Sequence, residues 1–416
     1  MNAPCLIVGS VGWRIGDRAD MLSFAVEWLH ILIRWFHLVV GIGWIGTSFF
    51  FIALDLSLRK RARMNPGVYG TAWLVHGGGF YNVEKYAVAP EELPEDLVWY
   101  RWEAYLTFVS GFLLLTTVYY FNARAYLIDP SVADLAPWQA IAISVLSLLL
   151  GWLAYDGLIR HTTDEYPGLV ALCLFLLIVG FAVLFGNLFS GRGAFIHVGA
   201  LVGTIMAANV FRVIIPNQKK IAAALMAGRK PDPALGLQGR QRSIHNNYLT
   251  LPVLLMMVSN HYPLLTGHPH GWLLVALILV IGGMVRHLLN RHEAGDLFRR
   301  YWWALPGAAV ALALAIVATA PAPRADVAEA GGVSDADVLR ITATHCTMCH
   351  AARPTHEGFS EPPKGLVFTD LDHIRRYAPL IRMQAVDSEV MPLGNETGIT
   401  RAERDALGAW IAANGG

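Results

Sequence analysis

Eight long apolar stretches constrain this chain more than any other feature of its sequence. A helix that spans a membrane needs roughly 20 mostly apolar residues, and each stretch reaches about that length. Hydrophobic residues make up 55% of the chain and charged residues only 15%, well below the roughly 25% of soluble domains. The sequence therefore predicts an all-α fold with a polytopic bundle of about eight transmembrane helices, at residues 24–56, 103–121, 137–158, 167–188, 194–216, 247–265, 270–289 and 300–320.

Lysine and arginine residues gather in every second loop between these stretches. Basic loops stay on the cytoplasmic side of a membrane protein, so both termini are predicted to lie on the outer side. This explains the basic runs without a nucleic-acid partner, and a net charge of +1 provides no field that would attract one. The basic loops contain Arg59, Lys60, Arg61, Arg63, Lys85 and Arg101, then Lys219, Lys220, Arg229, Lys230, Arg240 and Arg242, then Arg286, Arg291, Arg299 and Arg300.

Composition divides the chain into four parts. Residues 1–23 are interpreted as an N-terminal extension, with Met21 as an alternative start, because glycines interrupt them. Residues 24–320 form the predicted membrane domain, and the Pro/Ala/Gly-rich residues 321–333 form a linker. Residues 334–416 have the mixed charges of a soluble surface, and capping patterns at Ser334 and Thr400 predict a helix at each end of this small domain.

The small domain carries the most specific motif of the chain. Cys346-Thr-Met-Cys349-His350 is a C-x-x-C-H sequence, the attachment signature of one covalent c-type haem, with His350 as an axial ligand of its iron. The domain is therefore predicted to be a small α-helical class I cytochrome c. Met391 is the preferred second axial ligand, and Met383 is its rival. A redox dithiol or half of a zinc site is the alternative, but the sequence shows neither a βαβ pattern nor a second Cys/His pair.

Polar residues recur in and beside the apolar stretches, where each costs free energy and so suggests a function. Snorkelling arginines and helix-to-helix hydrogen bonds are the structural alternative. An outer group is a candidate for ligating an additional haem b or for relaying protons, and contains His37, Asn187, His197, Asn260 and His261. An inner group suits a planar, polar anion, and contains Glu103, Asp156, Arg160, His161, Asn209, Arg212, His245, Asn246, Asn247, Arg286 and His287.

Several stretches resemble one family over nearly the whole chain. With the C-x-x-C-H domain appended, the chain resembles the bacterial membrane-bound urate oxidases, or urate hydroxylases, which join an eight-helix domain to a C-terminal cytochrome c. The stretches that carry the resemblance are RWFHLVVGIGWIGTSFFFIALD (34–55), HGGGFYNVEKYAVAPEELP (76–94), RGAFIHVGALVGTIMAANVF (192–211), IIPNQKK (214–220), QRSIHNNYLTLPV (241–253) and SNHYP (259–263).

The resemblance implies hydroxylation of urate to 5-hydroxyisourate in purine catabolism. Two electrons would pass through haem c to a downstream cytochrome c or terminal oxidase, with the cytochrome domain on the periplasmic side of a bacterial inner membrane. The resemblance supplies no urate ligands, and depth and chemistry give the catalytic candidates His245, His287, Arg212, Asn246 and Asp55, with His245 or His287 as the base. The alternatives are a non-catalytic membrane cytochrome that relays electrons from quinol to a terminal oxidase, a transporter and a membrane anchor.

Overall fold

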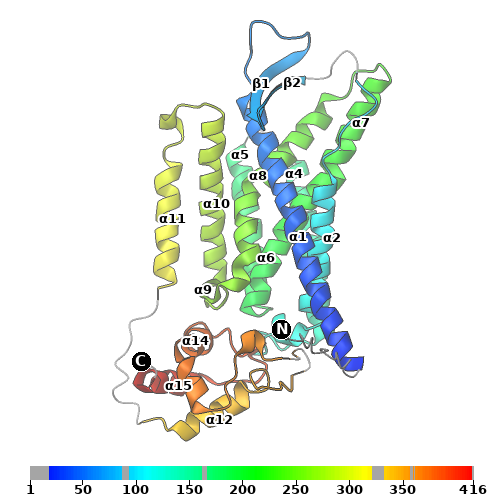
Figure 1. Cartoon of the computed structure of the whole chain (residues 1–416). Coiled ribbons are helices and arrows are strands. Elements are labelled where there is room, and N and C mark those ends of the chain that lie inside the picture. The colour runs from blue at the N-terminus through cyan, green and yellow to red at the C-terminus, as the bar shows by residue number, and fades with distance from the viewer. Residues whose placement is uncertain are drawn as a thin grey trace, which may run out of the picture.

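The computed structural model describes residues 18–86, 93–161, 166–320, 332–356, 359 and 361–414. They form a bundle of long helices with a smaller helical domain at one end (Figure 1). Most of the predicted N-terminal extension (1–23) and linker (321–333) lies outside the described residues, which begin at 18 and resume at 332. The helical elements of the bundle are α1 (Arg18–Ser57), α2 (Trp102–Leu114), η1 (Leu115–Tyr120), α3 (Ala123–Tyr126), α4 (Pro137–His161), α5 (Pro167–Gly186), α6 (Gly191–Ala208), η2 (Asn209–Ile214), α7 (Ile215–Met226), α8 (Pro233–Val258), η3 (Ser259–His261), α9 (Pro263–Thr266), α10 (Gly271–Glu293), η4 (Phe298–Arg300) and α11 (Ala304–Ala318).

Five helices among the described residues are long and apolar enough to cross a membrane, which is consistent with the predicted membrane association. They are Phe24–Ser57, Pro137–His161, Pro167–Gly186, Gly191–Met226 and Gly271–Glu293. The other three predicted stretches are also helical but are shorter or more polar, and correspond to α2 with the π-helical η1, to α8 and to the 15-residue α11. The count of eight spans therefore stays a prediction.

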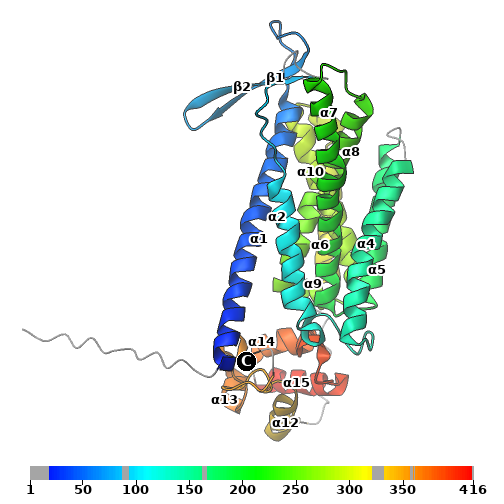
Figure 2. The same ribbon diagram turned by 90° about the vertical axis from the view of Figure 1, so that its right-hand side faces the viewer.

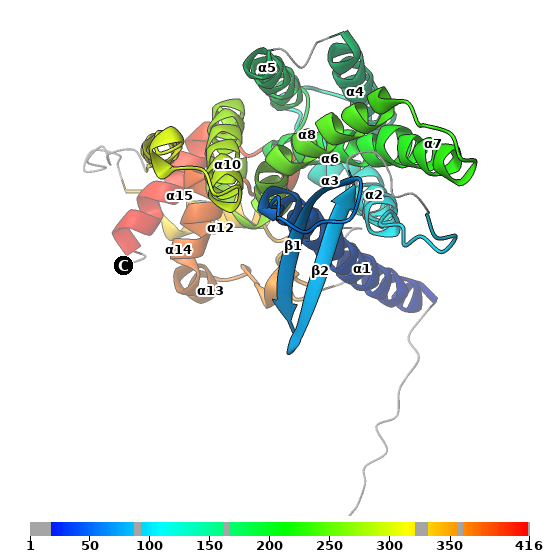
Figure 3. The same ribbon diagram turned by 90° about the horizontal axis from the view of Figure 1, so that it is seen from above.

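Helix α6 lies at the centre of the bundle and is the most buried of the five apolar helices. It packs against α4, α5 and α8, as the view from above shows (Figure 3). Small residues permit the close approach, because a Cβ atom added to Gly151 of α4 would lie 2.3 Å from Leu201 Cδ1 of α6. Pro252 of α8 is accommodated in the same way, since a Cβ atom on Gly282 of α10 would lie 2.6 Å from Pro252 Cδ.

Residues 68–86 depart from the all-helical prediction. They form an antiparallel hairpin of β1 (Val68–His76) and β2 (Gly79–Tyr86) at the end of the bundle that is remote from the C-terminal domain (Figure 2). Gly77 and Gly78 close the hairpin with φ angles of 59° and 79°, which glycine adopts without strain. The β-branched and aromatic residues on both sides of the glycine run were the strand signal that the prediction missed.

The small C-terminal domain begins and ends with a helix, which confirms the sequence prediction. Capping boxes open both helices, at Ser334 and at Thr400. Trp410 Nε1 donates to Asp335 Oδ1 at 2.7 Å and so joins the last helix to the first. The elements of this domain are α12 (Asp335–His345), η6 (Pro363–Gly365), α13 (Leu371–Arg376), α14 (Ala378–Ile381), η7 (Arg382–Asp387), η8 (Leu393–Asn395) and α15 (Arg401–Asn414).

The C-terminal domain packs against the end of the bundle at which α1 begins (Figures 1 and 2). Helix α3 contacts η8 there. A Cβ atom added to Gly267 of the bundle would lie 2.0 Å from the Ser388 carbonyl oxygen of the domain, so the two parts touch through backbone. The basic loops lie at the other end of the bundle (Figure 1). The assignment of these ends to the two sides of a membrane stays a prediction.

Candidate functional site

Cys346 and Cys349 lie on one turn directly after α12. The N–H groups of Cys349 and His350 donate to the Cys346 carbonyl oxygen at 3.2 and 2.8 Å, and neither cysteine forms a disulfide. Burial raises the pKa of the Cys346 thiol to about 12 and that of the Cys349 thiol to about 11, whereas a reactive dithiol needs a lowered pKa. No group of three or more His, Cys, Asp or Glu side chains within the described ranges could hold a metal ion.

His350 is anchored through one ring nitrogen. Nδ1 lies 3.0 Å from the Leu366 carbonyl oxygen, and a ring that donates there keeps Nε2 for a metal. The Phe368 ring packs on the imidazole, with the ring centroids 4.7 Å apart. Burial lowers the pKa of His350, which favours the neutral ring that binds iron.

Met391 is better placed than Met383 to act as a second ligand. Met391 packs against the apolar core that Cys346 also contacts, whereas Met383 is 45% exposed. The Met391 backbone is held on both sides, because Arg404 Nη1 donates to its carbonyl oxygen at 2.7 Å and its N–H donates to the Gln384 carbonyl oxygen at 2.9 Å. Two free thiols on one turn, an anchored imidazole, and a thioether packed against the core that Cys346 also contacts fit a covalent c-type haem.

A buried hydrogen-bond network joins three helical segments in the half of the bundle remote from the C-terminal domain. Arg242 of α8 donates to Asp156 of α4 at 2.7 Å and to Asn209 of η2 at 3.3 Å. Asn209 donates to the Tyr155 hydroxyl at 2.9 Å, and that hydroxyl lies 2.8 Å from His245 Nδ1. The network thus connects a buried ion pair to one of the two predicted bases.

A cavity of about 850 Å³ borders this network, among α5, α8, α10 and the start of α11. His245 and His287, the two predicted bases, both line it. Each histidine has a tyrosine hydroxyl beside its Nδ1 atom. The Tyr248 hydroxyl lies 2.9 Å from His287 Nδ1, and the Tyr155 hydroxyl lies 2.8 Å from His245 Nδ1. The Trp303 ring lies against His287, with centroids 5.4 Å apart. The cavity therefore combines an apolar and aromatic wall with two oriented imidazoles.

The other three catalytic candidates are divided by the fold. Asn246 joins the network, because its Oδ1 accepts from Asn209 at 2.9 Å. Arg212 is exposed, and Asp55 pairs with Lys85 of the hairpin at 2.6 Å, with both side chains almost half exposed. The structure therefore places His245, His287 and Asn246 at the cavity or its network and leaves Arg212 and Asp55 outside.

Two histidines of the predicted outer group, His37 and His197, join neighbouring helices in this structure. His197 of α6 is fully buried, and both ring nitrogens are occupied, Nδ1 by an α6 carbonyl oxygen at 2.7 Å and Nε2 by Ser144 Oγ at 2.6 Å. His37 Nδ1 contacts Ser110 Oγ at 2.9 Å between α1 and α2, and His261 is exposed. The ring of His197 thus has no nitrogen left for the iron of a second haem.

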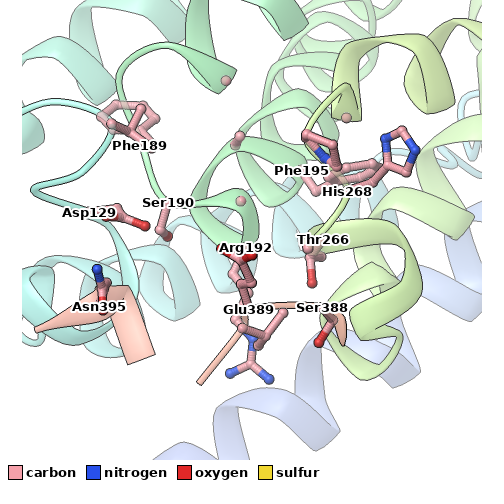
Figure 4. A pocket seen from close by; sticks show the side chains of 18 of the residues that line it. Asp129, Phe189, Ser190, Arg192, Phe195, Thr266, His268, Ser388, Glu389 and Asn395 are labelled. Carbon is pink, nitrogen blue, oxygen red and sulfur yellow. The ribbon is translucent and has the colours of Figure 1, made fainter. Parts of the chain in front are cut away.

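A second cavity, of about 420 Å³, lies where the C-terminal domain meets the bundle (Figure 4). Polar side chains from both parts line it, including Arg192 and Thr266 from the bundle and Glu389 and Asn395 from the domain. Residues on either side of Met391 form one wall, so the cavity borders the segment that carries the candidate ligand. The residues that line it are far apart in the sequence, so no local motif could predict this cavity.

Tyr155, Tyr248 and Arg242 were missed as site residues. Arg242 was assigned to a basic loop because the predicted stretch began at residue 247, but α8 begins at Pro233 and carries Arg242 into the bundle. The spacing of three and four residues from Arg242 to His245 and Asn246 was the available signal, since such residues lie close together on a helix.

Comparison with known proteins assigns a family to the part of the chain that contains the network and the large cavity. Neither the search of curated proteins nor that of solved structures gave a match. The model of the family described as Urate oxidase N-terminal matches residues 23–320, which end before the C-x-x-C-H motif. Because the match covers well over half of the sequence, this chain belongs to the Urate oxidase N-terminal family.

Proposed function

We propose that this chain hydroxylates urate to 5-hydroxyisourate within its helical bundle and that the electrons leave through a c-type haem on the C-terminal domain. Urate and water give 5-hydroxyisourate, two protons and two electrons, so the site needs a proton acceptor and a route for electrons. Family membership supports oxidation of urate, and the apolar helices support a membrane location. The alternative, a non-catalytic membrane cytochrome that relays electrons from quinol to a terminal oxidase, gains no support from a family whose description is urate oxidase.

The observation that carries this proposal is the cavity with two histidines in its wall. Urate is a planar purine anion at neutral pH. Tyr248 and Trp303 add aromatic rings to the lining, which suits a planar ligand, and Arg240 adds positive charge. We assign the role of base to His245. The Tyr155 hydroxyl at its Nδ1 fixes the orientation of the ring, and a general base must be held within hydrogen-bond reach of the proton that it removes.

Cys346, Cys349, His350 and Met391 would hold the haem. When bound, this group supplies a one-electron acceptor whose potential the thioether ligand raises. The four residues that would hold the haem lie at the opposite end of the bundle from His287. Helix α10 begins near that end, at Gly271, and His287 is about 24 Å further along its axis at ~1.5 Å per residue. A downstream cytochrome c or terminal oxidase would take the electrons from this outer end, on the periplasmic face of a bacterial inner membrane.

Aromatic side chains occupy the intervening half of the bundle. The rings of His197 and Tyr119 are 6.3 Å apart between centroids, and those of Tyr119 and Tyr126 are 6.1 Å apart. Tyr126 ends α3, the helix that contacts the C-terminal domain. This series connects the interior of the bundle with the surface on which the domain sits.

An isotope experiment on purified full-length protein in nanodiscs tests the proposed reaction. With urate in ¹⁸O-labelled water under air, and ferricyanide added as the electron acceptor, the 5-hydroxyisourate should carry one labelled oxygen, and no hydrogen peroxide should form. His245→Gln should lower kcat by about 10²-fold or more, the usual contribution of a general base, while urate still binds. Hydrogen peroxide formed in step with 5-hydroxyisourate, or a product oxygen that comes from O₂, would refute the proposal.

A further inference from the structure

The tip of the β1–β2 hairpin carries an exposed apolar surface. The segment 73–83 contains no Asp, Glu, Lys or Arg. Val75 pairs with Phe80 across the hairpin, and Trp73 lies two residues before Val75, so these three side chains share one face, which we call the apolar face of the hairpin. Phe80 is 75% exposed, Val75 69% and Trp73 57%. Large apolar side chains gathered on one exposed face indicate an interaction surface.

The base of the hairpin is fixed to the end of α1. Arg59 and Thr71 exchange two backbone hydrogen bonds of 3.0 Å, and Lys85 pairs with Asp55 in the last turn of α1 at 2.6 Å. Helix α1 supplies one of the apolar segments long enough to cross a membrane, Phe24–Ser57. The hairpin base therefore lies at the level where an apolar span ends, which in a bilayer is the boundary between hydrocarbon and headgroups.

The hairpin runs sideways from this anchor. Figure 2 shows it leaving the bundle across the direction of the helices, and the view from above shows it passing over α1 and beyond the bundle (Figure 3). Thr71 at the anchor and Gly77 at the turn are six residues apart, so the tip lies about 20 Å from the anchor at ~3.3 Å per residue. In a membrane, the tip would therefore lie over lipid.

Basic side chains flank the base of the hairpin. Lys60, Arg61 and Arg63, in the connection from α1 to β1, are all exposed. Lysine and arginine beside a membrane span attract anionic lipid headgroups, and tryptophan is enriched at the same depth. A second copy of this chain, docked hairpin to hairpin, would bring two such basic segments together, and like charges repel. The apolar tip and the basic base together thus fit a lipid surface better than a second copy.

Resting on the membrane location proposed above, we propose that the apolar face of the hairpin inserts into the headgroup layer of the bilayer at this end of the bundle. The basic connection then lies beside anionic lipid headgroups. Because the hairpin base is bonded to α1, the inserted tip fixes the depth at which α1 ends. No hairpin residue lines the large cavity, so this lipid contact is separate from the proposed urate site.

Photo-cross-linking of full-length protein in liposomes of neutral and anionic phospholipids tests this proposal. The photoreactive residue p-benzoylphenylalanine, which bonds to C–H groups within its reach on illumination, replaces Phe80, or Val75 if the first variant does not fold. Mass spectrometry should find lipid adducts at least fivefold more abundant there than at Arg340. That control lies on α12, on the far side of the C-terminal domain from the bundle (Figure 1), and its side chain is 61% exposed. Ile42, 63% exposed within the α1 span, is the positive control.

The outcomes separate the hairpin proposal from the membrane location on which it rests. Lipid adducts at Phe80 and Ile42, with only background at Arg340, would support both. A cross-linked dimer at Phe80 without lipid adducts would assign the apolar face to a second copy. A cross-link within one chain would assign it to another segment, and no cross-link would place it in water. Each of these three results would overturn the hairpin proposal, whereas a lack of lipid adducts at Ile42 would overturn the membrane location itself.

Discussion

Gly394 of the C-terminal domain lies directly against the Ile128 carbonyl oxygen of the bundle, where an added Cβ atom would be only 2.6 Å from that oxygen. No side chain fits such a contact, so we expect Gly394→Ala to loosen the joint between the two parts. Urate binding and haem attachment should persist, but haem reduction after rapid mixing with urate should slow at least tenfold. Stopped-flow absorbance measures this rate.

Gly398 supplies the matched control for this joint. Its φ angle of 66° is close to the 58° of Gly394, so alanine costs a similar backbone strain of roughly 1 kcal/mol at either position. A Cβ atom on Gly398 would meet nothing within 4 Å. Gly398→Ala should therefore keep the original rate, and equal slowing in both variants would refute the docking explanation.

The two Tyr–His pairs of the large cavity allow the base to be identified. Tyr155→Phe removes the hydroxyl 2.8 Å from His245 Nδ1, and Tyr248→Phe removes the one 2.9 Å from His287 Nδ1. We expect Tyr155→Phe to lower kcat about tenfold with little change in KM, because an imidazole that has lost this hydrogen bond is less firmly oriented and is a poorer base. Tyr248→Phe should affect kcat less. Steady-state kinetics of urate oxidation compares the two variants. A larger loss of kcat in Tyr248→Phe than in Tyr155→Phe would assign the base to His287.

The Asp156–Arg242 pair should contribute strongly to stability. Their side chains are 9% and 5% exposed, so Asp156→Asn leaves a buried guanidinium without its counter-charge, at a cost of about 3 kcal/mol or more. Lys85→Met breaks the Asp55–Lys85 pair, whose side chains are almost half exposed, and should cost about 1 kcal/mol or less. Thermal unfolding in detergent compares the two variants, and equal losses would contradict the buried network.

Met391 is expected to set the reduction potential of the haem. Met391→Leu removes the thioether and should lower the potential, while mass spectrometry still finds the haem attached at Cys346 and Cys349. Met383→Leu is the control, because that side chain is 45% exposed and away from the core that Met391 contacts. Redox titration measures both, and a lowered potential in Met383→Leu alone would reverse the ligand assignment.

Features with a local signal were predictable from the sequence. The spans of α1, α4, α5 and α10 follow from apolar length, and the helices that open at Ser334 and Thr400 follow from their caps. The C-x-x-C-H motif likewise requires only adjacent residues. The hairpin was missed because a short glycine run resembles any turn until its flanking strands are recognised.

The candidate site is built from contacts between residues that are far apart in the sequence, and a single sequence does not show which residues meet. Arg242 meets Asp156 across 86 positions, and Tyr155 meets His245 across 90, so no local pattern links them. Depth in the bundle selected His245, His287 and Asn246, which lie at the large cavity or in its network, but also Arg212, which is exposed, and Asp55, which pairs with the hairpin. Depth alone cannot tell which face of a helix a residue occupies.

The most direct test of the central claim is the haem absorbance of the oxidised protein when urate is added in the absence of oxygen. We predict that the reduced c-type spectrum appears as 5-hydroxyisourate forms, with two haems reduced for each urate oxidised and no such change in Cys346→Ala/Cys349→Ala protein. Formation of 5-hydroxyisourate while the haem stays oxidised, or a C-terminal domain that carries no haem in mature protein, would contradict the account.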